Sequence, residues 1–124
     1  ANVVIGMSGG EGWGLPEFHS VAMGKHSVIM DATGYKEWAT KENSELVTPS
    51  GKISSVDGVF FNEGADYNQG RIYDFDEDAF IDACEKVIKR VESNPENEEG
   101  LKLQDEFTYE KTTNQILSSI GYNA

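Results

Sequence analysis

Two short apolar runs with a helical pattern between them constrain the fold more than any other feature of this sequence. Asn2–Met7 and Ser27–Met30 are rich in β-branched residues, which is typical of buried strands. Residues 16–23 place apolar side chains at helical spacing. A strand, a helix and a second strand in that order favour an α/β fold with a parallel sheet. Leu46–Thr48 is a possible third strand, so we expect a short parallel sheet with flanking helices.

The clearest helix of the sequence follows an unusual segment. Residues 51–74 carry scattered glycines and aromatic side chains, which predicts an irregular excursion or a weak hairpin. Residues 77–92 then form an amphipathic pattern, with Asp76 as the N-cap. The apolar face of this helix is predicted to contain Phe80, Ile81, Ala83, Cys84, Val87, Ile88 and Val91.

The C-terminal part of the chain predicts two further helices. Residues 96–106 have the pattern of a polar helix, and residues 108–120 predict a last helix in which Ile116, Leu117 and Ile120 face inward. A length of 124 residues corresponds to one domain, which we assign to residues 1–124.

Acidic residues dominate the charge, with 22 Asp and Glu against 10 Lys and Arg and a net charge of −12. Such a field repels nucleic-acid phosphates and anionic membrane surfaces. No apolar run approaches the ~20 residues that a membrane-spanning helix needs. The single cysteine, Cys84, suits a reducing compartment. We therefore expect a cytoplasmic protein that binds no nucleic acid, no metal and no cofactor.

A glycine-rich turn, Ser8–Gly14, joins the first predicted strand to the first predicted helix. Glycines let the backbone approach a ligand closely, and the amides at the start of a helix favour a phosphate. Glu11 adds a carboxylate, which repels phosphate but accepts hydrogen bonds from sugar hydroxyls. These features together predict a nucleotide sugar as the ligand. In the alternative interpretation, the glycines only form a tight turn and Glu11 is solvated.

The segment Ser8–Gly24 resembles the signature of the group 1 glycosyltransferases, the retaining, glycogen-synthase-like family with the GT-B fold. Asp31–Glu37 is similar to the family's glycine-rich turn followed by Glu, and Leu46–Pro49 to its Leu-Val-x-Pro segment. Residues 76–91 resemble the helix that follows, and Phe107–Lys111 the Phe-Ser-Trp-Glu-Lys motif near the C-terminus. The resemblance implies the second half of a Rossmann-like, three-layer domain that binds the nucleotide-diphosphate sugar.

The resemblance also implies roles for individual residues. Glu11 corresponds to the first Glu of the family's Glu-x7-Glu pair, which contacts hydroxyls of the donor sugar, and is the catalytic candidate. His19 stands where the family has the second Glu, which holds the ribose hydroxyls. Glu37 either touches the ligand or only favours the start of a helix. Backbone amides for the sugar and the diphosphate are expected from Gly12, Trp13, Gly14 and Leu15.

Two of these assignments have alternatives. A neutral imidazole at His19 offers one acceptor where a carboxylate offers two oxygens, so the affinity for ribose or the choice of nucleotide is expected to differ from the family's. His19 is otherwise a half-exposed helix residue. The Trp13 ring either stacks on a base or sugar or caps the sheet.

The chain departs from the family in what it lacks. The acceptor-binding domain and the Arg/Lys pair that neutralises the diphosphate are absent, and the first residue is Ala rather than Met. We therefore expect a fragment or trimmed chain that is inactive in sugar transfer alone, because leaving-group charge needs cationic stabilisation. The alternative is a non-catalytic nucleotide-binding or oligomeric assembly module. In that case a homo-oligomer or a missing N-terminal domain covers the open sheet.

Overall fold

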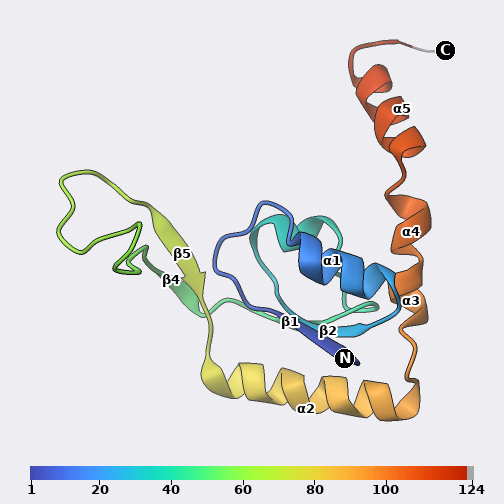
Figure 1. Ribbon diagram of the computed structural model, residues 1–124, viewed down its shortest axis with the longest axis horizontal. Coiled ribbons are helices and arrows are strands. Elements are labelled where there is room, and N and C mark those ends of the chain that lie inside the picture. Colours follow the sequence, from blue (N-terminus) through green and yellow to red (C-terminus); the bar gives the residue numbers. More distant parts are fainter. Residues whose placement is uncertain (123–124) are drawn as a thin grey trace.

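The computed structural model describes residues 1–122 and contains the expected parallel sheet. The sheet has three strands in the order β1–β2–β3, with β1 at Val3–Gly6, β2 at His26–Met30 and β3 at Glu45–Val47. Both strand pairs are parallel. The predicted α/β fold class is therefore confirmed, and the arrangement is that of a partial Rossmann-like fold (Figure 1).

Helices cover both faces of this sheet. The helix α1, Leu15–Ala22, packs on β1 and β2, and α2, Glu77–Ser93, packs on β2 and β3 from the other side. The central strand β2 is buried along its whole length. Ile29 belongs to the apolar cluster on the α1 face, and Val28 to the cluster on the α2 face. A strand covered on both faces needs apolar residues at successive positions, as at Val28–Met30, whereas the buried His26 and Ser27 at its start are polar.

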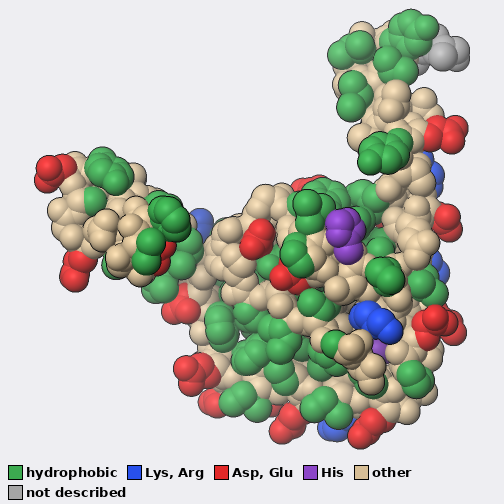
Figure 2. Space-filling model, in the orientation of Figure 1, with side chains coloured by type: hydrophobic (Ala, Val, Ile, Leu, Met, Phe, Trp, Pro, Cys, Tyr) green, Lys and Arg blue, Asp and Glu red, His purple; other side chains and the backbone are tan. Residues whose placement is uncertain are grey.

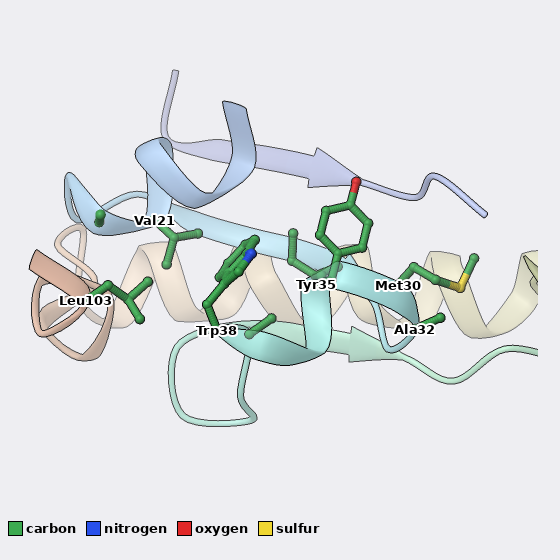
Figure 3. Packing of buried hydrophobic residues seen from close by; sticks show 9 residues of the cluster. Val21, Met30, Ala32, Tyr35, Trp38 and Leu103 are labelled. Carbon is green, nitrogen blue, oxygen red and sulfur yellow. The ribbon is translucent and has the colours of Figure 1, made fainter. Parts of the chain in front are cut away.

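The larger apolar cluster lies between the sheet and α1 (Figure 3). Its two largest side chains, Tyr35 and Trp38, are only 1% and 2% exposed. Val21 of α1 and Leu103, from a helix near the C-terminus, complete the same cluster. Burial of large aromatic side chains contributes strongly to the stability of a small domain, so this cluster fixes α1 and its preceding loop on the sheet.

Two segments that connect the main elements take regular forms. Between β2 and β3 the chain forms a short 3-10 helix, η1, at Thr33–Glu37. The segment 51–74 contains an antiparallel hairpin of β4, Gly51–Ser54, and β5, Arg71–Asp74. The hairpin alternative for this segment is thus confirmed, and the hairpin projects from the body of the molecule (Figure 1).

The helix α2 begins as expected, because the Asp76 carboxylate accepts a hydrogen bond of 3.0 Å from the amide of Ala79. Its predicted apolar face is only partly covered: Ala83 and Val87 are buried, whereas Ile81 and Ile88 are more than half exposed. The outward position of these two isoleucines corrects the prediction that the whole face is core. It also leaves apolar surface open on one side of α2.

The C-terminal region is less continuous than the sequence suggested. In place of one helix over residues 96–106, the chain forms α3 at Glu98–Leu101 and α4 at Leu103–Glu106. The last helix, α5, spans Tyr109–Ser119 and contains no buried residue. The prediction that its isoleucines face inward was wrong, because α5 extends away from the sheet (Figure 1).

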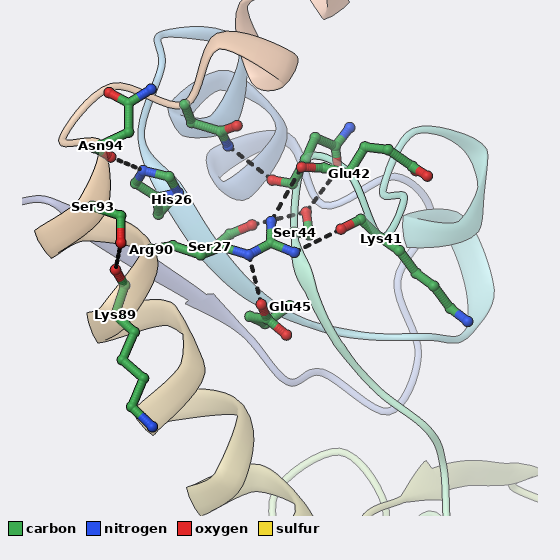
Figure 4. Close-up of polar contacts among 12 residues, drawn as sticks. His26, Ser27, Lys41, Glu42, Ser44, Glu45, Lys89, Arg90, Ser93 and Asn94 are labelled. Carbon is green, nitrogen blue, oxygen red and sulfur yellow. Dashed lines mark hydrogen bonds and ion pairs between the residues drawn. The ribbon is translucent and has the colours of Figure 1, made fainter.

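Arg90 of α2 ties the helix to the segment before β3 (Figure 4). Its Nε lies 2.6 Å from Oε1 of Glu45, and its two terminal nitrogens donate to the backbone carbonyls of Lys41 and Glu42. A guanidinium presents several donors in a fixed plane, which allows these three contacts at once. Over residues 1–122, no helix has the length and apolar character that crossing a membrane requires.

Candidate functional site

The candidate site is the loop that leaves the carboxyl end of β1 and enters α1. Gly14 is the N-cap of α1 and has a left-handed backbone, with φ of 77°. A Cβ at this position would lie 2.7 Å from Cδ1 of Tyr35, which is buried below it. Only glycine combines this backbone with so close an approach, so the residue type at position 14 follows directly from the packing.

The turn after β2 fixes the middle of this loop. The amide of Glu11 donates to Oγ1 of Thr33 at 3.1 Å, and the amide of Gly34 donates to the carbonyl of Glu11 at 3.0 Å. Thr33 has a φ of 54°, in the region that non-glycine residues rarely adopt. The amide of Tyr73 also donates to the carbonyl of Gly9 at 2.9 Å. The loop is therefore held by two other segments of the chain.

Two carboxylates lie at this end of the sheet. Oε2 of Glu17 would be 3.2 Å from a Cβ at Gly14, which places this carboxylate beside the N-terminus of α1. Burial, and then the charges of Glu17 and Glu11, raise the pKa of Tyr35 from 10.0 to about 12, although a backbone hydrogen bond at Ser8 lowers it. Within residues 1–122 no ion pair engages Glu11. The site is thus rich in hydrogen-bond acceptors and negative in charge.

Sequence reasoning overlooked Glu17 and Tyr35 as members of this site. Glu17 follows the N-cap glycine by three positions, where a carboxylate can turn back toward the first amides of a helix. That spacing is a signal in the sequence for Glu17. Tyr35 lies 21 residues beyond Gly14, and the sequence contains no local pattern that joins the two.

Trp13 packs within a group of aromatic rings. Its ring meets Phe18 edge-on with centroids 5.6 Å apart, and Phe107 with centroids 5.2 Å apart. The indole nitrogen of Trp38 donates to the carbonyl of Trp13 at 2.8 Å. Both contacts favour the alternative in which Trp13 covers the core. Its backbone carbonyl is already engaged, and its amide faces the turn at Gly34.

The other predicted site residues are at the surface. Gly12 is exposed and Leu15 is 55% exposed. His19 is exposed one helical turn after Leu15, with its ring 5.8 Å from that of Phe18. Glu37, the last residue of η1, is exposed, and among the described residues no hydrogen bond or ion pair joins it to Glu11. The loop residues and His19 follow one another at the entry to α1, and Glu37 ends the turn whose Thr33 and Gly34 hold the loop.

Metal ligands do not gather anywhere in the described part of the chain: residues 1–122 contain no cluster of three or more His, Cys, Asp or Glu side chains arranged to hold an ion. A polar cavity of about 530 Å³ lies near Arg90, on the side of β2 and β3 where these strands begin. There Nε2 of His26 lies 2.7 Å from the carbonyl of Asn94, while the buried Nδ1 of the same ring has no partner among residues 1–122. These contacts join α2 to the sheet.

Comparisons with known proteins give no match. No protein-family model fits the chain, and neither a curated protein nor a solved structure is significantly similar to it. The glycosyltransferase resemblance of the signature residues therefore stays a prediction from the sequence.

Proposed function

We propose that the chain is the nucleotide-sugar-binding portion of a retaining glycosyltransferase. In this proposal the loop amides at Gly12, Gly14 and Leu15 bind the diphosphate and sugar, Glu11 accepts hydrogen bonds from sugar hydroxyls, and His19 lies near the ribose. The complete reaction would transfer the sugar to an acceptor hydroxyl, and this chain alone would be inactive. A reducing, cytoplasmic location fits its single cysteine.

One observation carries the proposal: the turn after β2 holds the glycine loop in place by hydrogen bonds and packing. The Thr33 hydroxyl and the Gly34 amide hold the backbone of Glu11, and Tyr35 supports the left-handed turn at Gly14. Gly14 has no side chain that could cap α1, and Pro16 has no amide, so the donors at the helix start are the amides of Leu15 and Glu17. A preorganised backbone lowers the entropic cost of binding, and free amides at a helix start suit an anionic group.

Because the site is negatively charged, the sugar hydroxyls of the ligand should contribute more to its affinity than the diphosphate does. Glu17 lies beside the first turn of α1 and opposes a phosphate there, whereas both Glu11 and Glu17 accept hydrogen bonds from hydroxyls. A bare diphosphate should therefore bind weakly, and a sugar nucleotide should gain from contacts that the bare nucleotide cannot make.

Isothermal titration calorimetry with nucleoside diphosphates and with their sugar derivatives tests this proposal. We expect Glu11→Gln to weaken the binding of a sugar nucleotide by about 1.5–3 kcal/mol, the usual value of a hydrogen bond to a charged group, and to change the binding of the bare nucleotide little. Glu85→Gln, a matched loss of one exposed carboxylate on α2, should leave both affinities unchanged.

Two results would overturn the proposal. One is the absence of any heat at millimolar concentrations of every sugar nucleotide tested. The other is an equal effect of Glu11→Gln on the sugar nucleotide and the bare nucleotide. As a further check, Glu17→Gln should strengthen the binding of the bare diphosphate several-fold, because it removes a negative charge beside the helix start.

A further inference from the structure

The segment that joins β4 to β5 forms a cavity of its own, which we call the hairpin cavity. It has a volume of about 560 Å³, and all the residues that line it lie within residues 54–70. Figure 1 shows this segment as a wide loop at the end of the projecting hairpin. Small-molecule sites have volumes of about 300–1,000 Å³, so the loop alone encloses enough space for a small ligand.

Hydrogen bonds within the loop hold the walls of this cavity. The Asp57 carboxylate accepts hydrogen bonds of 2.8 and 2.9 Å from three successive amides, those of residues 59–61. The amide of Asn62 donates to Oε1 of Gln69 at 2.9 Å, and Nε2 of Gln69 donates to the carbonyl of Asn62 at 2.7 Å. This reciprocal pair joins the two sides of the loop, and it lowers the entropic cost of binding a ligand between them.

One buried hydroxyl at the cavity wall is free. Ser55 is only 7% exposed, although all four residues of β4 before it are exposed. Its backbone amide donates to the carbonyl of Gly70 at 3.2 Å, but within residues 1–122 no hydrogen bond engages its side-chain hydroxyl. Ser55 lines the cavity, and its hydroxyl is not sealed from that space. Buried polar groups are normally hydrogen-bonded, so this free hydroxyl points to a ligand that engages it.

The lining of the hairpin cavity is polar and carries little charge. Residues 54–70 contain neither Lys nor Arg, and Glu63 is the one carboxylate among the lining residues. Figure 2 shows acidic but no basic side chains at the outer end of the hairpin. A phosphate or carboxylate group therefore has no cation to pair with here. A metal ion also fits poorly, because one carboxylate provides too few ligands.

The remaining groups match the surface of a sugar ring. Hydroxyls and side-chain amides both donate and accept hydrogen bonds, and the wall provides them at Ser54, Ser55 and Asn68. Tyr67 also lines the cavity and is 69% exposed, so its ring offers an apolar face next to these polar groups. A sugar has hydroxyls around its ring and C–H groups on its faces, so it can use both kinds of contact.

We propose that the hairpin cavity binds an uncharged sugar. The Tyr67 ring packs on one face of the sugar, and the Ser55 hydroxyl exchanges a hydrogen bond with one of its hydroxyls. Asn68 adds a donor, and Glu63 acts only as an acceptor. The inference concerns residues 54–70 and does not depend on the proposed function, whose ligand binds at the glycine loop.

Heteronuclear NMR of the whole chain provides the first test, with maltose, cellobiose and diacetylchitobiose as probes. We expect at least one of these disaccharides, at millimolar concentration, to shift the amide resonances of residues 54–70 and to leave those of residues 9–15 unchanged. Inorganic phosphate at the same concentration should leave the loop resonances unchanged. Selective shifts of the loop with phosphate would show an anion site and refute the assignment to an uncharged sugar.

Three variants test the contacts. Tyr67→Ala should raise the dissociation constant of the bound disaccharide at least about tenfold, because it removes the apolar face of the site. Ser55→Ala should raise it about threefold without lowering the free energy of unfolding, because no hydrogen bond within the chain is lost. Phe60→Ala is the matched control and should change the constant less than about twofold, since Phe60 is 79% exposed on the same loop but does not line the cavity.

Urea unfolding of each variant shows whether a loss of affinity reflects the site or the fold. Tyr67 and Phe60 are both exposed, so neither substitution should change the free energy of unfolding by more than about 0.5 kcal/mol. The proposal fails if none of the three disaccharides shifts the resonances of residues 54–70. It also fails if Tyr67→Ala and Phe60→Ala weaken binding equally.

Discussion

Replacement of Gly14 by alanine tests whether the entry to α1 has the structure that the candidate site requires. The new Cβ would lie 2.7 Å from Cδ1 of Tyr35, whose side chain is only 1% exposed. The left-handed backbone at this residue costs a non-glycine residue about 1–2 kcal/mol. Overpacking against a buried ring costs about 1–3 kcal/mol more. We expect Gly14→Ala to lower the free energy of unfolding by about 2–5 kcal/mol.

Gly12 in the same loop is the matched control. Nothing lies within 4 Å of a Cβ at this position, and its backbone is outside the left-handed region. Gly12→Ala removes conformational freedom from the unfolded chain and should stabilise the protein by up to about 1 kcal/mol. Urea denaturation followed by circular dichroism measures both variants, and the two midpoints should differ by about 1 M or more.

A double-mutant cycle separates the two costs at Gly14. In a Tyr35→Ala background the ring is gone, so Gly14→Ala should cost only the backbone part, about 1–2 kcal/mol. If Gly14→Ala and Gly12→Ala have equal effects, or if the cost at Gly14 is the same with and without Tyr35, the packing argument is wrong.

Three other expectations follow from particular contacts. The pKa of Tyr35 is raised to about 12, so the stability that its neutral phenol contributes, about 2–3 kcal/mol, should be complete below pH 10 and lost as the pH rises to 12. Urea unfolding of the wild type and of Tyr35→Phe across this pH range measures the loss, and a difference in unfolding free energy that does not change with pH contradicts it. Asn97→Ala removes three hydrogen bonds of a side chain that is 3% exposed and should cost about 2–5 kcal/mol in the same assay. Gly34→Ala directs a Cβ into the backbone of Gly12, so it should destabilise the loop by at least about 1 kcal/mol, whereas Gly10→Ala, with 3.8 Å to its nearest neighbour, should not.

The fold was accessible from the sequence because its sheet is short and covered on both faces. Val3–Ile5 of β1 and Val28–Met30 of β2 are all apolar, and the glycine-rich turn between β1 and α1 leaves few other arrangements. The cap at Asp76 is a local signal, and it operates as expected. These features depend on neighbouring residues in the chain, which a single sequence displays directly.

The position of each apolar face was harder to predict. The spacing of Ile116 and Ile120 indicates an amphipathic helix, but a periodic pattern does not specify what covers it. The same holds for Ile81 and Ile88, which continue the apolar pattern of α2 beyond the width of the sheet below it. An apolar pattern in the sequence therefore predicts a buried surface correctly only where another element of the same chain packs against it.

The composition of the candidate site was accessible only in part. Glu11, Gly12 and Gly14 lie on one contiguous loop, and their proximity follows from the sequence. The support from Thr33 and Tyr35 comes from a turn about 20 residues away, and it is set by the parallel pairing of β1 with β2. Parallel pairing places the carboxyl ends of both strands at one edge of the sheet, so the turn after β2 contacts the loop after β1.

The β4–β5 hairpin connects the two proposals and also separates them. The amide of Tyr73 in β5 donates to the carbonyl of Gly9, so the base of the hairpin lies against the glycine loop. The hairpin cavity lies at the opposite end of the two strands, within residues 54–70. Glu11→Gln should therefore leave the affinity for a disaccharide unchanged, and Tyr67→Ala should leave the affinity for a sugar nucleotide unchanged. Independent responses of this kind would show that the two ligands bind at separate sites of the chain.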